Sequence, residues 1–326
     1  MIIVQTPLRV SFLGGGTDFE GFYAKHGGAV LSTGIDKCVY VVIKERFDDL
    51  IYINYSQKEI VESVDEIQHD LVREAMKMTG VSSGIEITSM ADIPTEGTGL
   101  GSSSSFTVAL LHGLYAHQGE RRESEKIADE ACKIEIDILG APIGKQDQYI
   151  AAYGGLRLIS FDGCGVKPER ISLDSQKKKA FNDNLMLFYT GMTRKANGVL
   201  AEQKTNIDEK VGVLSEMRDM AYQAKEAINC GEFDEFGEIM HHGWELKKGL
   251  ASKISNEEID GMYNAAHKSG AIGGKISGAG GGGFLLLYCP TRKQDDVRAS
   301  LSKLRELPFH CEPDGSKVIF NYRRAS

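Results

Sequence analysis

The chain has 326 residues, 41% hydrophobic and 26% charged, which is the composition of a folded globular protein rather than of a disordered or collagen-like chain. Its net charge of −8, from 38 basic and 46 acidic residues, argues against nucleic acid or an anionic membrane surface as a partner. No apolar run approaches the roughly 18 residues that a membrane-spanning helix needs. At about 150 residues per domain, the length indicates about two domains.

The predicted elements are strands in the first part of the chain and mainly helices afterwards. β-Branched, aromatic or alternating stretches predict strands at 38–44, 51–55, 84–89, 156–161, 184–190 and 316–321. Helical spacing of apolar residues predicts helices near 66–78, after Gly101, at 124–139, across much of 196–250, and near 255–268 and 292–305. This order indicates an α+β fold in two lobes, which we place at 1–178 and 179–326.

The cysteines and the N-terminal residues indicate in which cellular compartment the protein is expected to work. The six cysteines are scattered and form no Cys-x-x-Cys pair, so the sequence indicates no structural zinc site. The stretch Met1–Pro7 has no basic residues before its apolar ones, which is not typical of a secretory signal, and it is predicted to be a strand. We therefore expect a cytoplasmic protein with reduced thiols. A monomer and a homodimer are both compatible with the sequence.

Glycine is unusually frequent, with 37 residues against about 23 expected at a frequency of about 7%. The glycines gather in three clusters, at 14–16, 97–101 and 273–283. Clustered glycines are typical of loops that need positive φ or that bring backbone close to a ligand. The three clusters are therefore candidate binding loops.

The cluster at 97–101 lies in the stretch Ile93–Ser105, which ends in four serines and leads into an apolar helix. Glycines let the backbone wrap around an anion, serines cap a helix, and the first helical turn offers free N–H groups and a positive dipole end. Together these features predict a phosphate site, with a plain Gly/Ser turn as the alternative. The spacing fits neither a standard P-loop nor a dinucleotide fingerprint.

The other two clusters have unusual neighbours. In Thr6–Asp18, Arg9 lies in an apolar strand, where a charge needs a partner, and Asp18 follows three glycines. A short acid beside bare backbone suits the recognition of hydroxyl groups, although Arg9 could equally form a structural ion pair. In Lys275–Gly283 the glycines exceed what a turn needs, and a strand follows them.

These three motifs, in this order, resemble those of the GHMP kinase superfamily, named for galactokinase, homoserine kinase, mevalonate kinase and phosphomevalonate kinase. The resemblance implies a lobe like ribosomal protein S5 domain 2, a ferredoxin-like second lobe, and ATP and substrate between them. The stretches 14–18, 99–106, 144–149, 192–194 and 275–279 look closest to the D-glycero-D-manno-heptose 7-phosphate kinase branch, which phosphorylates the anomeric oxygen. Glu96 departs from the usual loop and leaves the loop geometry open.

The resemblance implies ATP and Mg²⁺ as cofactors, with Asp147 as the base and Arg9 as the group that keeps it ionised. At about 100° per residue, Glu135 lies on the buried flank of the helix 124–139, and we expect it to bind Mg²⁺ with Ser103, a buried salt bridge being the alternative. The expected nucleotide-binding residues are Gly97, Gly99, Leu100, Gly101, Ser102, Ser103 and Ser104. The expected substrate-binding residues are Gly15, Gly16, Thr17, Asp18, Gly278, Ala279, Gly280 and Gly281.

A sugar phosphate is the expected substrate, and its own phosphate needs a local cation. Arg194 is the first choice, because a guanidinium forms a planar fork that fits phosphate, and Lys248 is the second. The alternatives are another sugar 1-kinase for fucose, galactose or a uronic acid, a decarboxylase that first phosphorylates, and a non-catalytic regulator on the same fold. The presence of Arg9, Ser103, Glu135 and Asp147 disfavours the regulator.

Overall fold

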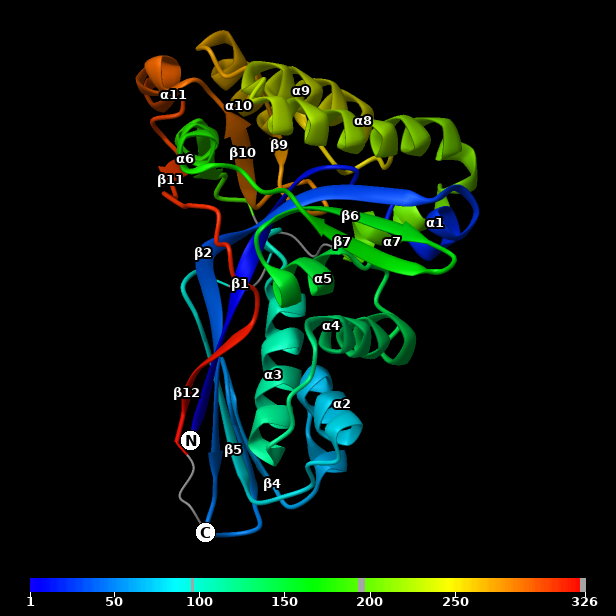
Figure 1. Ribbon diagram of the computed structural model, residues 1–326, viewed down its shortest axis with the longest axis vertical. Helices are drawn as coiled ribbons and strands as arrows, with labels where there is room; N and C mark the ends of the chain where they lie inside the picture. The colour runs from blue at the N-terminus through cyan, green and yellow to red at the C-terminus, as the bar shows by residue number, and fades with distance from the viewer. Residues whose placement is uncertain (95–96, 193–196, 323–326) are drawn as a thin grey trace.

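The structure is a computed structural model and describes residues 1–94, 97–192 and 197–322. These residues form an eight-stranded and a four-stranded sheet, with helices packed on both (Figure 1). The first sheet contains β1 (Ile2–Leu13), β2 (Gly28–Glu45), β3 (Ile51–Asn54), β4 (Lys58–Val61), β5 (Ile85–Ala91), β6 (Leu156–Asp162), β7 (Gly165–Arg170) and β12 (Lys317–Asn321). The second contains β8 (Leu185–Tyr189), β9 (Gly273–Ile276), β10 (Phe284–Tyr288) and β11 (Arg305–Glu306).

The helices fall into two groups along the chain. Those of the first half are α1 (Glu20–His26), α2 (Asp70–Thr79), α3 (Ser102–Gln118), α4 (Ser124–Cys132), the π-helical segment η2 (Lys133–Ile138) and α5 (Gln146–Tyr153). Those of the second half are α6 (Ser175–Asp183), α7 (Asn197–Thr205), α8 (Val211–Cys230), α9 (Phe233–Lys248), α10 (Glu257–Lys268) and α11 (Gln294–Ser300). Short 3₁₀ turns lie at Val64–Glu66, Asp208–Lys210 and Thr291–Lys293.

The long strand β2 organises the first sheet. It runs antiparallel to β1, while its first part (28–33) pairs with β6 and its last part (39–45) pairs with β5. The register between β1 and β2 shifts after Pro7 and again after Ser11, which bends both strands. A proline is tolerated here because such irregularities free a backbone position from the ladder. The segment of β1 between the two shifts passes between the lobes and carries Arg9.

Helix α3 is the centre of the first lobe. It packs against β1, β2, α2, α4 and α5, and apolar residues on all its sides are therefore buried. Figure 1 shows α2, α3 and α4 on the same side of the lower part of the sheet. This packing fixes the N-terminal end of α3, which directly follows the glycine loop 97–101, in the middle of the molecule.

The second sheet has the order β11-β8-β10-β9 and is antiparallel throughout. Helix α9 packs on β9, and α8 packs on α9 and reaches back to β1 and β2. The rings of Phe12, Phe181 and Phe236 meet between the lobes, with centroids 5.3–5.7 Å apart. The two lobes therefore share one apolar core, which holds the glycine loops of both in a fixed relation.

The predicted strands from 38–44 to 184–190 are present within β2, β3, β5, β6 and β8. The structure does not divide at 178/179. That position lies inside α6, and β12 returns to pair with β1 in the first sheet. The predicted helix 124–139 is α-helical only to Cys132 and then continues as η2. A local sequence pattern reveals neither the pairing of β12 with β1 nor the π-helical segment η2. Both depend on packing against parts of the chain that are distant in sequence.

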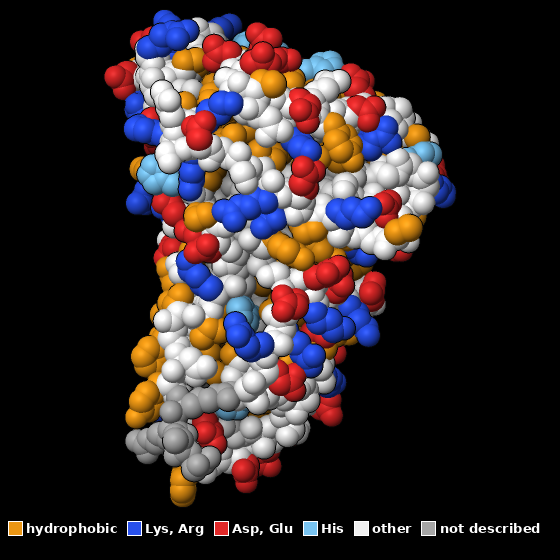
Figure 2. Space-filling view, viewed as in Figure 1, with side chains coloured by type: hydrophobic (Ala, Val, Ile, Leu, Met, Phe, Trp, Pro, Cys, Tyr) orange, Lys and Arg blue, Asp and Glu red, His pale blue; other side chains and the backbone are white. Residues whose placement is uncertain are grey.

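In residues 1–94, 97–192 and 197–322, no helix combines the length and apolar character required to cross a bilayer. On the face drawn in Figure 2, acidic and basic side chains are interspersed over both lobes.

Candidate active site

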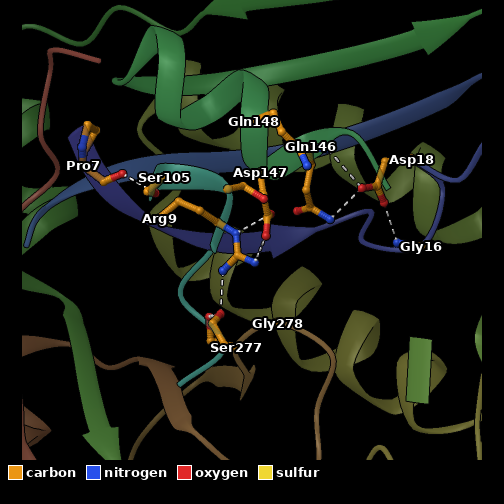
Figure 3. A network of polar contacts seen from close by, with 12 residues as sticks. Pro7, Arg9, Gly16, Asp18, Ser105, Gln146, Asp147, Gln148, Ser277 and Gly278 are labelled. Carbon is orange, nitrogen blue, oxygen red and sulfur yellow. Dashed lines mark hydrogen bonds and ion pairs between the residues drawn. The ribbon is translucent and has the colours of Figure 1, made fainter. Parts of the chain in front are cut away.

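The centre of the site is an ion pair between β1 and α5. The Arg9 Nε and Nη2 atoms donate to the two carboxylate oxygens of Asp147, each at 2.7 Å (Figure 3). Arg9 is only 5% exposed, and such a buried charge requires a paired partner. Its third bond, from Nη1 to the Gly99 carbonyl at 2.5 Å, ties the pair to the Gly/Ser loop. The expected contact between Arg9 and Asp147 is thus present, and their catalytic roles remain predictions.

Asp18 lies near this pair, in the turn that follows β1. Its carboxylate accepts hydrogen bonds from the Gly16 N–H at 2.9 Å, and from the backbone and side-chain nitrogens of Gln146 at 3.2 and 3.0 Å (Figure 3). Burial raises the pKa of Asp18, and the negative charge of Asp147 adds to this rise. A Cβ on Gly144 would lie 2.1 Å from Asp18 Oδ2, so only glycine fits there.

The residues of the glycine turn 14–16 and the following Thr17 do not all face the cleft. Gly15 and Gly16 line the same cleft as Asp18. Thr17 is fully buried, and its hydroxyl donates to the carbonyls of Gly14 and Ala29. The structure therefore makes Thr17 a residue that holds the turn, and does not place it among the substrate-facing residues where the motif put it.

The Gly/Ser loop packs against the C-terminal glycine loop. A Cβ on Gly99 would lie 2.3 Å from the Ser277 carbonyl oxygen, and one on Gly278 would lie 2.7 Å from the Gly99 Cα. The Ser277 hydroxyl donates to the Gly99 carbonyl at 3.0 Å. Gly99 has φ +73° and Gly278 has φ +72°, which favours glycine at both positions. Backbone thus meets backbone where the two lobes join.

Other residues of the C-terminal loop have different neighbours. Gly278 and Ala279 line the cleft. The Gly281 N–H donates to the Ile254 carbonyl at 2.7 Å, and a Cβ on Gly280 would lie 2.8 Å from Ile254. The predicted substrate residues Gly280 and Gly281 therefore pack on the segment before α10, because the loop curls away from the cleft after Ala279.

The start of α3 fits a phosphate group. Gly101, at φ +75°, precedes the first helical residue, and the first-turn N–H groups point away from the helix. The hydroxyls of Thr98 and Ser102 are buried and have no hydrogen-bond partner among the described residues. The Leu100 side chain is fully buried in the shared core, so only its backbone can serve a ligand. Gly97 has φ +67°, and its predicted neighbour Glu96 lies outside the described residues.

Glu135 is a buried carboxylate on η2, as its place on the buried flank predicted, and is 3% exposed. It accepts hydrogen bonds from the Ser104 hydroxyl and the Gln148 amide at 2.8 Å, and from the Thr107 hydroxyl at 2.5 Å. Burial raises its pKa to about 7, and the charge on Asp147 adds to the effect. The hydroxyl that contacts Glu135 is that of Ser104, while the expected partner Ser103 is exposed.

The residues around Glu135 fit a magnesium ion. Among the described residues, the carboxylate is contacted by the hydroxyl groups of Ser104 and Thr107 and by the side-chain nitrogen of Gln148, and carboxylate and hydroxyl oxygens are hard donors of the kind that Mg²⁺ prefers. The Gln148 Oε1 atom is buried without a partner among the described residues. Those residues include no cluster of three or more His, Cys, Asp or Glu side chains able to hold a metal alone.

Two buried lysines also line the cleft. Lys247, in the last turn of α9, donates from Nζ to the Gly278 carbonyl, and Lys275 lies in β9. Burial lowers the pKa of Lys247 to about 8 and that of Lys275 well below its usual value, and repulsion from Arg9 contributes to both shifts. With Arg9, the two lysines bring three nitrogen-bearing side chains into the cleft beside the carboxylates of Asp18 and Asp147. Their N–H groups can donate hydrogen bonds to the oxygens of an anionic ligand.

The two predicted phosphate-binding cations lie elsewhere. Lys248 is not among the residues that line the cleft, and its Nζ pairs with Glu245 at 2.8 Å. Consecutive residues of a helix point about 100° apart, so only Lys247 can face the cleft. Arg194 lies outside the described residues.

Comparison with known proteins identifies the family. The chain matches the N-terminal domain of the GHMP kinases over residues 54–155 and their C-terminal domain over residues 221–306, together more than half of its length. The chain is a GHMP kinase. The expected two-lobed α+β fold is thereby confirmed.

The relatives of this GHMP kinase include several enzymes named for sugars. It is 29% identical to the D-glycero-alpha-D-manno-heptose 7-phosphate kinase of Campylobacter jejuni, over 91% of this chain and 92% of that protein. It is 28% identical to the L-fucokinase/L-fucose-1-P guanylyltransferase of Bacteroides fragilis, of which it spans 34%. A putative sugar kinase from Campylobacter jejuni has the same fold, with a TM-score of 0.79 and 26% identity over 97% of each chain.

Sequence reasoning missed several residues that line the cleft of this GHMP kinase. For Lys247 a signal was present, since Phe236, Met240 and Trp244 precede it at helical spacing and are all buried. Lys275 lies in the buried strand β9, beside the glycine loop. The roles of Ser104 and Gln148 had no such signal, because their contacts with Glu135 depend on how α3, η2 and α5 pack together.

Proposed function

We propose that this GHMP kinase transfers a phosphoryl group from ATP to the anomeric hydroxyl of D-glycero-D-manno-heptose 7-phosphate, giving the 1,7-bisphosphate. The observation that carries the proposal is the Asp147 carboxylate, whose two oxygens both accept hydrogen bonds from Arg9. This carboxylate lies in a cleft that is lined by Asp18 and by glycines of both lobes. The 29% identity to a heptose 7-phosphate kinase supports this sugar among those that the family takes.

In the proposed reaction, Asp147 orients the anomeric hydroxyl and accepts its proton as the new O–P bond forms and the bond to the leaving diphosphate breaks. Arg9 orients Asp147 through both carboxylate oxygens and adds positive charge where negative charge develops on the phosphoryl oxygens. Phosphoryl transfer depends mostly on positioning and electrostatics, so these two groups can suffice. An anomeric hydroxyl is more acidic than an ordinary alcohol, which makes the demand on the base smaller.

ATP with Mg²⁺ supplies the phosphoryl group when bound. The first turn of α3 and the unpartnered hydroxyls of Thr98 and Ser102 would hold its phosphates, and Glu135 would hold the metal. Ser103, which is exposed at the same helix start, remains a proposed second metal ligand. Asp18, with Gly15 and Gly16, would bind hydroxyl groups of the sugar.

The phosphate that the substrate already carries needs a cation of its own. Arg194 remains our first candidate, from its sequence motif. Lys247 replaces Lys248 as the second, because it lines the cleft and Lys248 does not.

Another sugar 1-kinase, acting on fucose, galactose or a uronic acid, is the alternative that the relatives favour, since fucokinases and galactokinases are among them at 25–28% identity. Such sugars carry no phosphate, whereas Arg9, Lys247 and Lys275 line the cleft with N–H groups that can donate to a phosphate, which supports the phosphorylated substrate.

A panel of sugars and sugar phosphates in a coupled assay of ADP release tests the proposal. We expect the highest kcat/KM for heptose 7-phosphate, with phosphorus bound to the anomeric oxygen of the product in a ³¹P–¹H correlation spectrum. A higher kcat/KM for an unphosphorylated sugar would replace the proposal with the sugar 1-kinase. Transfer to no sugar at all would refute both.

A further inference from the structure

Three buried polar atoms in the cleft have no hydrogen-bond partner among the residues that the structure describes. They are the Ser11 hydroxyl oxygen, the Gln146 side-chain oxygen and the Gln203 side-chain nitrogen. All three residues line the cleft that contains Asp18 and Asp147, although they come from β1, α5 and α7. Buried polar groups are nearly always paired, so three unpaired ones around one cleft indicate ligand atoms that complete them.

Each of the three has its place fixed by the surrounding fold. Ser11 follows Arg9 by two positions in β1, so both side chains lie on the same face of the strand. The Gln146 amide nitrogen donates to Asp18 at 3.0 Å, which turns its oxygen toward Asp147 (Figure 3). Gln203 is 7% exposed and faces the glycine turn, where a Cβ on Gly16 would lie 3.7 Å from its Oε1.

The glycine turn leaves room for a ligand between these residues. Among the described residues, a Cβ on Gly15 would meet only the Gln146 side-chain nitrogen at 3.7 Å and the Ser11 hydroxyl at 3.9 Å, both ordinary contact distances. Steric contact with the described residues therefore does not explain why residue 15 is a glycine. Its bare backbone leaves open space beside the unpaired Ser11 hydroxyl and the Gln146 side chain.

The unpaired atoms differ in chemistry, and this difference selects the ligand. The Gln146 oxygen can only accept a hydrogen bond, the Gln203 nitrogen can only donate one, and the Ser11 hydroxyl can do both. A phosphate or carboxylate, when ionised, only accepts and would leave the Gln146 oxygen unpaired. Neighbouring hydroxyl groups, each a donor and an acceptor, match all three atoms.

We propose that Ser11, Gln146 and Gln203 bind the hydroxyl groups of the sugar that are not phosphorylated and so determine which sugar the kinase accepts. This inference rests on the proposed function, which supplies a sugar as the ligand. Gln146 lies between Asp18 and Asp147 and thus binds the hydroxyl nearest the reacting oxygen. Ser11 and Gln203 bind hydroxyls further along the sugar.

The test uses Ser11→Ala and Gln203→Leu, which remove a polar atom and keep the approximate size. Binding of heptose 7-phosphate, and of analogues that each lack one ring hydroxyl, is measured by calorimetry without nucleotide. The first control is Ser32→Ala. Ser32 lies opposite Ser11 on β2, and its buried hydroxyl also lacks a hydrogen-bond partner among the described residues, but it does not line the cleft. The second control is Gln176→Leu, at an exposed position of α6.

We expect Ser11→Ala and Gln203→Leu to raise the Kd for heptose 7-phosphate by roughly tenfold each, the usual effect of one lost hydrogen bond. Each variant should bind one particular deoxy analogue as well as the wild type does, because that analogue lacks the hydroxyl concerned. The melting temperature of the free protein should stay the same or rise, since an unpaired buried polar atom is removed. The controls should bind like the wild type.

Two results would overturn the inference. One is that both variants bind every sugar within twofold of the wild type while the wild type phosphorylates heptose 7-phosphate, and this leaves the proposed function intact. The other is a lower melting temperature with unchanged binding, which assigns the residues a structural role. If the wild type neither binds nor phosphorylates any sugar of the panel, the proposed function fails and the inference fails with it.

Discussion

The Arg9 guanidinium and the Asp147 carboxylate bind each other through two hydrogen bonds of 2.7 Å across 138 positions of sequence. Arg9 lies in the bent part of β1, and Asp147 lies in the first turn of α5. Arg9 also donates a hydrogen bond to the Gly99 carbonyl, which connects the pair to the glycine loop 97–101. This pair joins β1, α5 and the glycine loop 97–101 at one point of the molecule.

Asp147→Asn should reduce kcat by about 10²–10⁴, because it removes the proton acceptor and keeps the shape. Steady-state kinetics measure the loss, and thermal unfolding shows that the fold is retained. Asp137→Asn, an exposed acid on η2, is the matched control and should retain full activity. An Asp147→Asn enzyme with near-normal kcat would remove the residue from the role of base.

Glu135→Gln should raise the Mg²⁺ concentration needed for half-maximal activity and lower kcat, because an amide is a weaker ligand than a carboxylate. Ser103→Ala should act in the same direction to a smaller extent. Titration of the rate with Mg²⁺ at saturating ATP measures both, with the exposed Glu125→Gln as the control. An unaltered Mg²⁺ dependence in Glu135→Gln would mean that this carboxylate does not hold the metal.

Arg194→Ala should lower kcat/KM for heptose 7-phosphate by about tenfold to 150-fold, since a lost charge-assisted bond to phosphate costs roughly 1.5–3 kcal/mol. The loss should be small for the unphosphorylated heptose. Lys247→Met tests the second candidate in the same assay, and Lys248→Ala serves as the control, because Lys248 pairs with Glu245 outside the cleft. Equal losses on both sugars would show that the substituted residue does not bind the substrate phosphate.

Lys247→Met should also be at least as stable as the wild type at pH 7, because it removes a buried ammonium group. The folded pKa of about 8 lies below the usual 10.5, so between these values the unfolded chain holds a proton that the folded chain has lost. Stability due to this residue therefore rises with pH in that window, by up to ~1.4 kcal/mol per pH unit.

Denaturant unfolding of Lys247→Met and wild type at pH 7 and at pH 9.5 measures this effect. The advantage of the variant should shrink at the higher pH. Lys275, whose pKa burial lowers in the same direction, is present in both proteins. A variant that is less stable than the wild type by the same amount at both pH values would contradict the prediction.

Gly99→Ala should destabilise the protein and weaken ATP binding, because its Cβ would lie 2.3 Å from the Ser277 carbonyl oxygen at φ +73°. Gly191→Ala is a matched control, with φ +75° and no atom of the described residues within 4 Å of its Cβ. It carries the same backbone strain, of order 1 kcal/mol, without the clash. Melting temperatures that fall equally in the two variants would mean that the contact between the two glycine loops contributes nothing.

The sequence by itself determined the three glycine motifs and most of the strands, and its resemblance to the GHMP kinases supplied Asp147 as the partner of Arg9. Arg9 stood out because a charge in an apolar strand needs a partner, and Glu135 stood out because an acid on the buried flank of a helix is costly. Each of these signals is local: periodicity within one element, or a residue type that conflicts with its neighbours. Local signals are readable because they depend on the geometry of a single strand or helix.

Only the tertiary structure decided which side chains share the cleft. It selected Lys247 over Lys248, placed Ser104 rather than Ser103 on Glu135, and returned β12 to the first sheet. It also left the polar atoms of Ser11, Gln146 and Gln203 unpaired around one space. These outcomes depend on how elements far apart in the chain pack, because a one-residue rotation of a helix or a shifted strand register changes every contact between lobes.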